Sequence, residues 1–300
     1  MTAEPGSVAP PPAGPLRALA ATLYRRPRAQ LALLLAAPLG WLVIAYLGSL
    51  ALFFITSFWS VDSFSGKLIT TPTLDNYAAV VSTPVYRTIA VRTLIMAALV
   101  TITTILVAFP IAFYMARMAS ARTRGMLVVS ILLPLWSGYL VKVYAWRLIL
   151  SQGGVLNSVL APVGLSGPGY SDVAVWLVES YLWLPYMIVP IYAGLERIPT
   201  SLLEASSDLG GRSWITLRRV ILPLALPAVV AGSIFTFSLT LGDYITPTLV
   251  SNTKFIGNVV YDFMGIAGNQ PFAAAYAMVP VSIILVYLLI ARRLGAFEAL

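Results

Sequence analysis

The sequence predicts an all-α membrane protein with six transmembrane helices and both termini in the cytoplasm. Of its 300 residues, 59% are hydrophobic and only 10% are charged, against about 25% in soluble proteins. The mean hydropathy is +0.87, so most of the surface must face lipid rather than water. The chain has no His and no Cys, which excludes disulfides, Cys/His metal sites and Ser-His or Cys-His nucleophile pairs.

A transmembrane helix needs roughly 20 apolar residues to cross about 30 Å of hydrocarbon. Residues 1–30, rich in Pro and Ala, predict a disordered cytoplasmic tail. The transmembrane domain covers residues 31–295, and residues 296–300 form a short C-terminal tail. Six stretches qualify as spans: residues 31–59, 89–116, 126–150, 173–194, 220–250 and 273–291.

The positive charges indicate the orientation. With the N-terminus inside, the inward segments hold 13 Lys and Arg residues. The outward side holds four: Lys67, Arg87, Arg92 and Lys254. Because cytoplasmic loops carry the excess of Lys and Arg, the net charge of +8 reflects membrane topology. Nucleic-acid binding is therefore not expected.

The inward loop between the fourth and fifth spans predicts a short helix at about residues 200–211. Pro199 ends the preceding helix, and Ser201 with Glu204 has the spacing of a capping box. Gly210 and Gly211 can supply a C-terminal cap. Such an amphipathic helix suits a groove on a cytosolic partner, while resting on the lipid headgroups is an alternative that the residues alone leave open.

The same loop resembles the EAA motif of ABC importer permeases, in which E-A-A is followed by three residues, Gly, nine residues and I-x-L-P. The matching residues are Glu204, Ala205, Gly210, Leu222 and Pro223, while Ser206 and Val220 replace Ala and Ile. Residues 133–150, 181–199 and 241–251 also look like permease subunits of spermidine/putrescine importers. The resemblance covers nearly everything after the N-terminal tail.

This resemblance implies a type I (MetI-like) importer in the bacterial cytoplasmic membrane. It implies a second homologous permease forming a heterodimer, two cytosolic ATPase subunits, an extracytoplasmic substrate-binding protein and surrounding lipid. The chain has no G-x-x-x-x-G-K-[ST] loop, so ATP and Mg belong to the ATPases, and this chain needs no cofactor and is not an enzyme. The residues expected to couple to the ATPase are Ser201, Leu202, Leu203, Glu204, Ala205, Asp208, Leu209 and Gly210.

Rare charges inside the spans mark a candidate substrate path. If the helices are straight, Lys142 lies about 24 Å along the third span and Asp243 about 35 Å along the fifth, both in the outer half. Glu179, Trp183 and Tyr186 share one helical face, which suits an organic ammonium. The full predicted path or gate contains Trp136, Tyr139, Lys142, Tyr144, Glu179, Trp183, Tyr186, Asp243 and Tyr244. The alternatives are interfacial aromatic belts and pairing of Lys142 with Glu179 or Asp243.

The predicted function is import of a small organic cation, with a polyamine such as spermidine or putrescine as the expected solute. An opine, an amino-acid-derived solute or a phosphonate is an alternative cargo. An ion-coupled secondary transporter could use Glu179 and Asp243 as an ion site but has no use for the EAA pattern. An intramembrane enzyme lacks an evident nucleophile-base pair.

Overall fold

The computed structural model describes residues 27–62 and 64–293, and the chain divides into two units at Ile55 and Thr56. The first unit contains α2 (Pro27–Trp41), the π-helix η1 (Leu42–Leu47) and most of α3 (Gly48–Thr56). Together they form one apolar span, Gln30–Thr56. The helix therefore already includes residues 27–30, which the sequence assigns to the tail. The rest of that tail and the tail at 296–300 lie outside the described residues.

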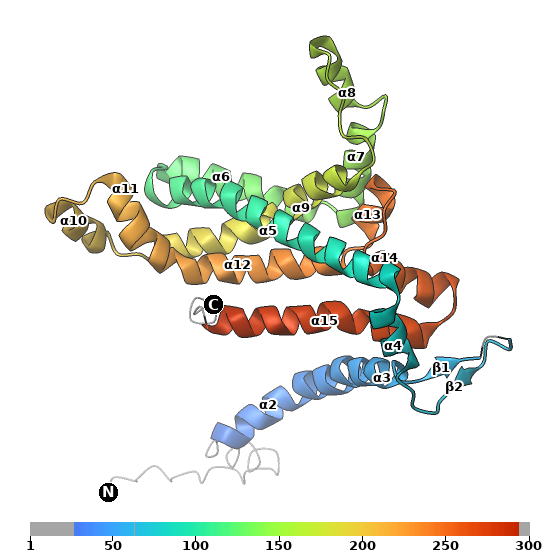
Figure 1. Cartoon of the computed structure of the whole chain (residues 1–300). Helices are drawn as coiled ribbons and strands as arrows, with labels where there is room; N and C mark the ends of the chain where they lie inside the picture. The colour runs from blue at the N-terminus through green and yellow to red at the C-terminus, as the bar shows by residue number, and fades with distance from the viewer. Residues whose placement is uncertain (1–26, 63, 294–300) are drawn as a thin grey trace, which may run out of the picture. The chain divides into compact units, whose positions relative to one another are not determined.

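Three long helices form the core of the second unit: α5 (Pro84–Arg117), α9 (Asp172–Glu196) and α12 (Leu222–Gly242). Figure 1 shows them side by side, with α15 (Gln270–Arg293) running along α12. Small residues allow α9 and α12 to approach closely, since a Cβ added at Gly194 would lie 2.3 Å from the Cβ of Ala228. The helices that carry Glu179 and the inner loop are thus tightly packed.

The third span is broken, which corrects the prediction of one straight helix over residues 126–150. α6 (Ala121–Trp136) and α7 (Tyr139–Leu150) meet at an angle of 94°. Pro134 removes a helical hydrogen bond near the end of α6, and the extended Ser137 and Gly138 separate the two helices. After α7 follow α8 (Val155–Leu160) and η2 (Ala161–Val163). The straight-helix depth of Lys142 is consequently wrong.

The fifth span also differs from its predicted range of 220–250. It runs over Ser213–Gly242, through α11 (Ser213–Thr216), the π-helix η3 (Leu217–Ile221) and α12. The chain then turns at Asp243 into α13 (Ile245–Val250), α14 (Ile256–Tyr261) and the π-helix η4 (Asp262–Ile266). Asp243 therefore lies between two helices rather than inside one.

A small hairpin precedes the bundle in the second unit. β1 (Ser60–Val61) pairs antiparallel with β2 (Leu68–Ile69), with Ser60 opposite Ile69. In the turn, Asp62 accepts hydrogen bonds from the backbone N–H groups of Phe64 and Ser65 and from the Ser65 hydroxyl. These bonds, led by the Ser65 N–H, hold the pKa of Asp62 below its ordinary value. Helix α4 (Asp75–Ser82) then leads into α5.

Five helices in the described residues are long and apolar enough to cross a membrane, and the bent pair α6 and α7 supplies a sixth span. Apart from Gln30–Thr56 and Ser213–Gly242, these are Pro84–Arg117, Asp172–Glu196 and Gln270–Arg293. Five of the six predicted spans are therefore present as candidate spans in the predicted order, with boundaries shifted by several residues, and the predicted third span corresponds to the bent pair, which counts as a sixth when taken as one span.

Candidate functional site

The inner loop contains a short, exposed helix, α10 (Thr200–Asp208), inside the predicted range. Leu203 packs onto a core cluster that includes Leu195 and Ile221, and Ser206 shares a hydrogen bond of 2.8 Å with Thr216. The other side of α10 is open: Leu202, Glu204, Ala205, Asp208 and Leu209 are exposed, as is Ser201. Leu209 is 89% exposed, so the helix presents an apolar side chain away from its own protein.

Glycine ends this helix as predicted. Gly210 has a φ of +76°, in the left-handed region that other residues rarely adopt. Its N–H donates to the Ser207 carbonyl at 2.9 Å, and the Gly211 N–H donates to the Ser206 carbonyl at 2.8 Å. This pair of bonds is a Schellman motif, which satisfies carbonyls left free at the helix end and turns the chain back sharply.

The start of the helix corrects the prediction of a capping box. α10 begins at Thr200, and the N-cap residue is Pro199, which makes no side-chain capping bond. Ser201 therefore lies inside the first turn, where its hydroxyl cannot fill the N-cap role, and the Ser201–Glu204 spacing is incidental. Pro199, with φ of −62° and ψ of 139°, sets the change of direction from α9 into α10.

At the other end of the bundle, four predicted path residues come together. The rings of Tyr139 on α7 and Trp183 on α9 stack with centroids 5.9 Å apart and planes 8° apart. Tyr186 meets the edge of Trp183 at 6.1 Å. The Tyr139 hydroxyl donates to Oδ2 of Asp243 at 2.5 Å, which joins α7 to the end of α12. The broken third span thus brings Tyr139 over the aromatic face of α9.

Asp243 has a local structural partner on each oxygen. Besides accepting from Tyr139, it accepts through Oδ1 from the N–H groups of Ile245 at 2.9 Å and Thr246 at 3.3 Å. The carboxylate thereby caps the first turn of α13. The Thr246 hydroxyl, 2.8 Å from that of Tyr139, completes the network. Sequence reasoning did not single out Thr246, because the turn at residue 243 was expected inside a helix.

Glu179 differs from Asp243 in having no such partners. It is only 1% exposed, and its Oε2 atom has no hydrogen-bond partner among the described residues. The Nε1 atom of Trp183 and the hydroxyl of Thr240 are also buried without a geometrically normal hydrogen bond there. Buried polar groups are usually satisfied. The Thr240 hydroxyl faces the Glu179 carboxyl, so an unsatisfied donor and an unsatisfied acceptor lie together between α9 and α12.

Lys142 does not join this cluster. It is half-buried and lines a separate pocket of about 210 Å³ with Ser130, Pro134 and Tyr181. Across residues 27–62 and 64–293, the ion pairs are Arg124 with Glu196 and Lys254 with Asp262. The expected alternative, in which Lys142 pairs with Glu179 or Asp243, is therefore not found there.

Three other predicted path aromatics also lie apart from Glu179. Trp136, at the end of α6, is 92% exposed, and Tyr144 is exposed on α7. Tyr244 stacks on Tyr261 at 4.7 Å and lines a different pocket of about 470 Å³. The structure consequently narrows the acid-aromatic cluster to Tyr139, Glu179, Trp183, Tyr186 and Asp243.

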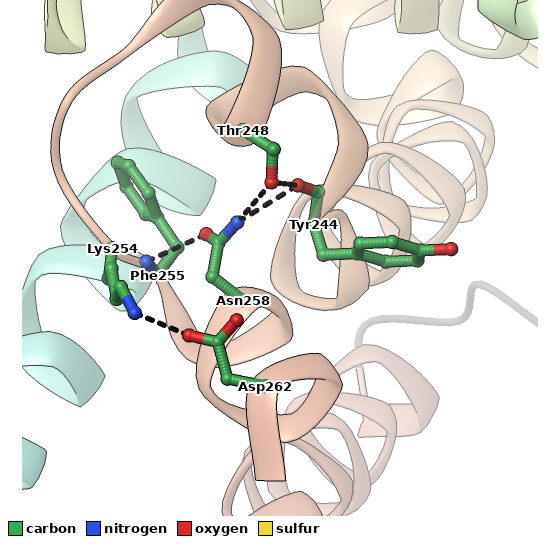
Figure 2. A network of polar contacts seen from close by, with 6 residues as sticks. All are labelled: Tyr244, Thr248, Lys254, Phe255, Asn258 and Asp262. Atoms are coloured by element: carbon green, nitrogen blue, oxygen red, sulfur yellow. Dashed lines mark hydrogen bonds and ion pairs between the residues drawn. The ribbon is translucent and has the colours of Figure 1, made fainter. Parts of the chain in front are cut away.

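A polar network fixes the outer turn after Asp243, and sequence reasoning missed it. In Figure 2, Asn258 accepts from the Phe255 N–H and donates to the Tyr244 carbonyl and the Thr248 hydroxyl, at 2.9, 2.9 and 2.7 Å. Nearby, Lys254 pairs with Asp262. Asn258 thus ties α13 to α14 and holds the Asp243 turn in place.

The described residues thus form an apolar helical bundle with an exposed helix between two of its candidate spans. The family described as "Binding-protein-dependent transport system inner membrane component" matches residues 108–296. The chain belongs to this family: it is the multi-pass inner-membrane permease of a binding-protein-dependent ABC importer. A permease of this family is not itself catalytic and binds no cofactor.

Similar proteins agree with this assignment. The chain is 44% identical over 293 residues to the inner membrane ABC transporter permease protein YdcU of Escherichia coli K12, covering 92% of this chain and 93% of that protein. It is 30% identical to the spermidine/putrescine permease PotB of the same organism, covering 79% and 87%. PotB of Haemophilus influenzae is 32% identical, covering 69% and 73%.

Solved structures show the same fold. A bacterial ABC transporter that imports the acidic polysaccharide alginate matches with a TM-score of 0.68, covering 93% of this chain and 98% of that one at 16% identity. The MetNI methionine transporter matches with a TM-score of 0.52, covering 70% and 93%. The type I importer permease fold predicted from the sequence is thereby confirmed.

Proposed function

We propose that this permease conducts a small organic cation of the polyamine class. The observation that carries the proposal is the buried Glu179 carboxyl, whose Oε2 atom makes no hydrogen bond of normal geometry, one helical turn before Trp183 and its stacking partner Tyr139. An alkylammonium group would satisfy the carboxylate by charge pairing and the rings by cation-π contact. Because Asp243 is occupied as a helix cap, Glu179 is the acid left to receive the solute.

The chemistry of the cluster favours a cation over the alternative cargoes. A phosphonate would bring its negative charge next to Glu179, and Lys142 lines a different pocket and does not neutralise that acid. The resemblance to PotB proteins, whose names specify spermidine and putrescine, supports the same solute class. The similarity to an alginate importer is at 16% identity and concerns the fold alone.

The same proposal assigns α10 to the ATPase contact. The exposed Leu209, with Leu202 and Ala205 on the open side of the helix, suits a cleft on a cytosolic subunit. We assign two ATPase subunits to the complex, together with a second homologous permease in a heterodimer and an extracytoplasmic binding protein. Glu204 and Asp208 would then meet polar groups at the rim of the cleft, where exposed charges remain hydrated.

Helix α9 connects the proposed ATPase contact on α10 to Glu179. α9 carries Glu179 in its outer half and ends at Glu196, three residues before α10 starts. Over the 16 residues from Glu179 to Leu195, the helix spans about 24 Å. When ATP closes the partner subunits, a displaced α10 would move α9 as a rigid body. This movement would separate the Tyr139 ring from Trp183, next to Glu179.

Uptake by the reconstituted complex tests the solute class. Proteoliposomes containing both permeases and the ATPases, supplied with the binding protein, should accumulate labelled putrescine or spermidine. Glu179→Gln, which keeps the shape but removes the charge, should lower uptake roughly tenfold, as expected for losing one charge-assisted interaction. Asp75→Asn, at an exposed acid on α4, is the matched control and should leave uptake unchanged. Uptake of only a sugar, an opine or a phosphonate would reject the proposed solute.

A further inference from the structure

Arg117, the last residue of α5, holds the inner end of α9. Its Nη2 atom donates to the carbonyl of Leu195 at 2.5 Å and to the carbonyl of Ile198 at 2.7 Å. Both acceptors lie where α9 ends, and carbonyls at a helix C-terminus have no partner within the helix. A guanidinium there satisfies the Ile198 carbonyl and adds a donor to the Leu195 carbonyl, which also accepts from the Ile198 N–H at 3.3 Å. Its charge interacts favourably with the negative end of the helix dipole.

The Leu195 carbonyl lies in the last turn of α9, and the Ile198 carbonyl lies within the turn that leads into α10. Only residues 197–199 separate the end of α9 at Glu196 from the start of α10 at Thr200. Leu195 is fully buried and Ile198 nearly so, so the side chains on this turn are packed into the core while Arg117 binds the backbone. Arg117 therefore ties to α5 the turn whose direction Pro199 sets.

Arginine suits this role better than lysine. One planar guanidinium nitrogen can donate to two carbonyls at once, whereas an ammonium group is a compact, strongly hydrated charge on a flexible stem. The Nε atom of Arg117 is buried and makes no hydrogen bond among the described residues. The Arg117 guanidinium is thus partly removed from water where it binds the turn, and this desolvation costs free energy that an exposed arginine does not lose.

A second arginine nearby provides a contrast. Arg124 on α6 pairs with Glu196 at 3.4 Å, and both side chains are more than a third exposed. Exposed pairs of this kind contribute little to stability, because solvent screens them. Arg124 also donates through Nε to the Met115 carbonyl on α5 at 3.1 Å, but it binds neither the Leu195 nor the Ile198 carbonyl. It is therefore the control for a charged contact at the same helix end that leaves the turn untouched.

We propose that Arg117 is a positioning residue for transport: it locks the α9–α10 turn to α5, so that movement of α10 is passed to α5 and α9 together. This inference rests on the proposed contact of α10 with the ATPases. Without the lock, α10 would pivot on residues 197–199 when the ATPases close. ATP hydrolysis would then continue while the helices that carry the path move less.

The test measures how many solute molecules enter for each ATP hydrolysed by the reconstituted complex. Arg117→Met should lower this ratio roughly tenfold, about the effect of losing one charged hydrogen bond on an equilibrium. Arg117→Lys, which can reach one carbonyl, should give an intermediate ratio. Arg124→Met should leave the ratio within about twofold of the wild type. If Arg117→Met only impairs folding, uptake and hydrolysis should fall in proportion and their ratio should stay constant. A constant ratio in Arg117→Met would therefore overturn the proposal.

A distance measurement supplies a readout that does not depend on activity. The chain has no cysteine, so spin labels can be placed at Met118→Cys and Thr200→Cys, two exposed positions at the ends of α5 and α10. In the assembled complex, Arg117→Met should broaden the distribution of distances between the labels, and Arg124→Met should not. An unchanged distribution in Arg117→Met would overturn the proposal.

Leu209→Asp separates this inference from the assignment on which it rests. If α10 contacts the ATPases, this substitution should weaken assembly and stimulated hydrolysis, because it places a charge in an apolar contact. Normal assembly and hydrolysis in Leu209→Asp would remove the proposed ATPase contact. A disrupted Leu209→Asp complex together with a normal Arg117→Met ratio would remove only the positioning role.

Discussion

The close crossing of α9 and α12 at Gly194 makes a quantitative prediction about the helix that links the candidate site to α10. A Cβ at residue 194 would lie 2.3 Å from the Ala228 Cβ, whereas ordinary contacts begin at 3.4 Å. The two helices would have to separate by about 1 Å at this point, and overpacking of a well-packed core costs typically about 1–3 kcal/mol. Gly194→Ala should therefore destabilise the permease by about that amount.

Thermal unfolding of the detergent-solubilised complex measures this effect. For a chain of 300 residues, the entropy of unfolding is about 0.6 kcal/mol per kelvin, so a loss of about 1–3 kcal/mol lowers the midpoint by about 2–5 °C. Gly125→Ala, in α6, is the matched control, since its added Cβ meets nothing within 4 Å. Because alanine favours a helix over glycine, that control should be neutral or slightly stabilising.

A second substitution shows whether the clash is the cause. In the double variant Gly194→Ala with Ala228→Gly, the Cβ is moved from one helix to the other, and the nearest remaining Ala228 atom, its Cα, lies 3.8 Å away. Stability and uptake should then return to near wild type, apart from about 0.5–1 kcal/mol for a glycine inside α12. Equal midpoints for Gly194→Ala and Gly125→Ala, or a double variant no better than Gly194→Ala, would refute the reasoning.

Two further predictions concern the ends of short helices. In Gly210→Ala the added Cβ meets no atom within 4 Å, but alanine is forced to a φ of +76°, which costs about 1 kcal/mol. ATPase stimulation in the complex should therefore fall about fivefold. An unchanged rate would contradict the need for glycine at this turn. The side chain in Asp243→Asn can still accept from the Ile245 N–H, whereas that in Asp243→Ala cannot. Asp243→Ala should therefore lose about 1 kcal/mol of stability and show a lower thermal midpoint, while the midpoint of Asp243→Asn should change little. Equal losses for both would show that the charge, rather than the cap, is required.

The sequence by itself determined the class of fold and the place of the inner helix. In lipid, a backbone must satisfy its own hydrogen bonds, so every long apolar stretch has to become a helix whatever it packs against. The excess of Lys and Arg that indicates the orientation and the glycine at residue 210 that ends α10 are also local signals. The EAA pattern that locates the inner helix likewise depends only on the spacing of residues along one segment. The local capping-box pattern nevertheless misplaced the N-cap by two residues, since Pro199 and not Ser201 occupies it.

Tertiary structure decided which of the rare polar residues act together. The Tyr139–Asp243 bond joins residues 104 positions apart, and Arg117 reaches carbonyls 78 and 81 positions away. Such pairings depend on how helices cross and where a span breaks, as at Ser137 and Gly138, and no local pattern encodes either. The tertiary structure therefore makes Asp243 a helix cap and places Lys142 in a separate pocket. It also buries Glu179 with an Oε2 atom that makes no hydrogen bond of normal geometry among the described residues.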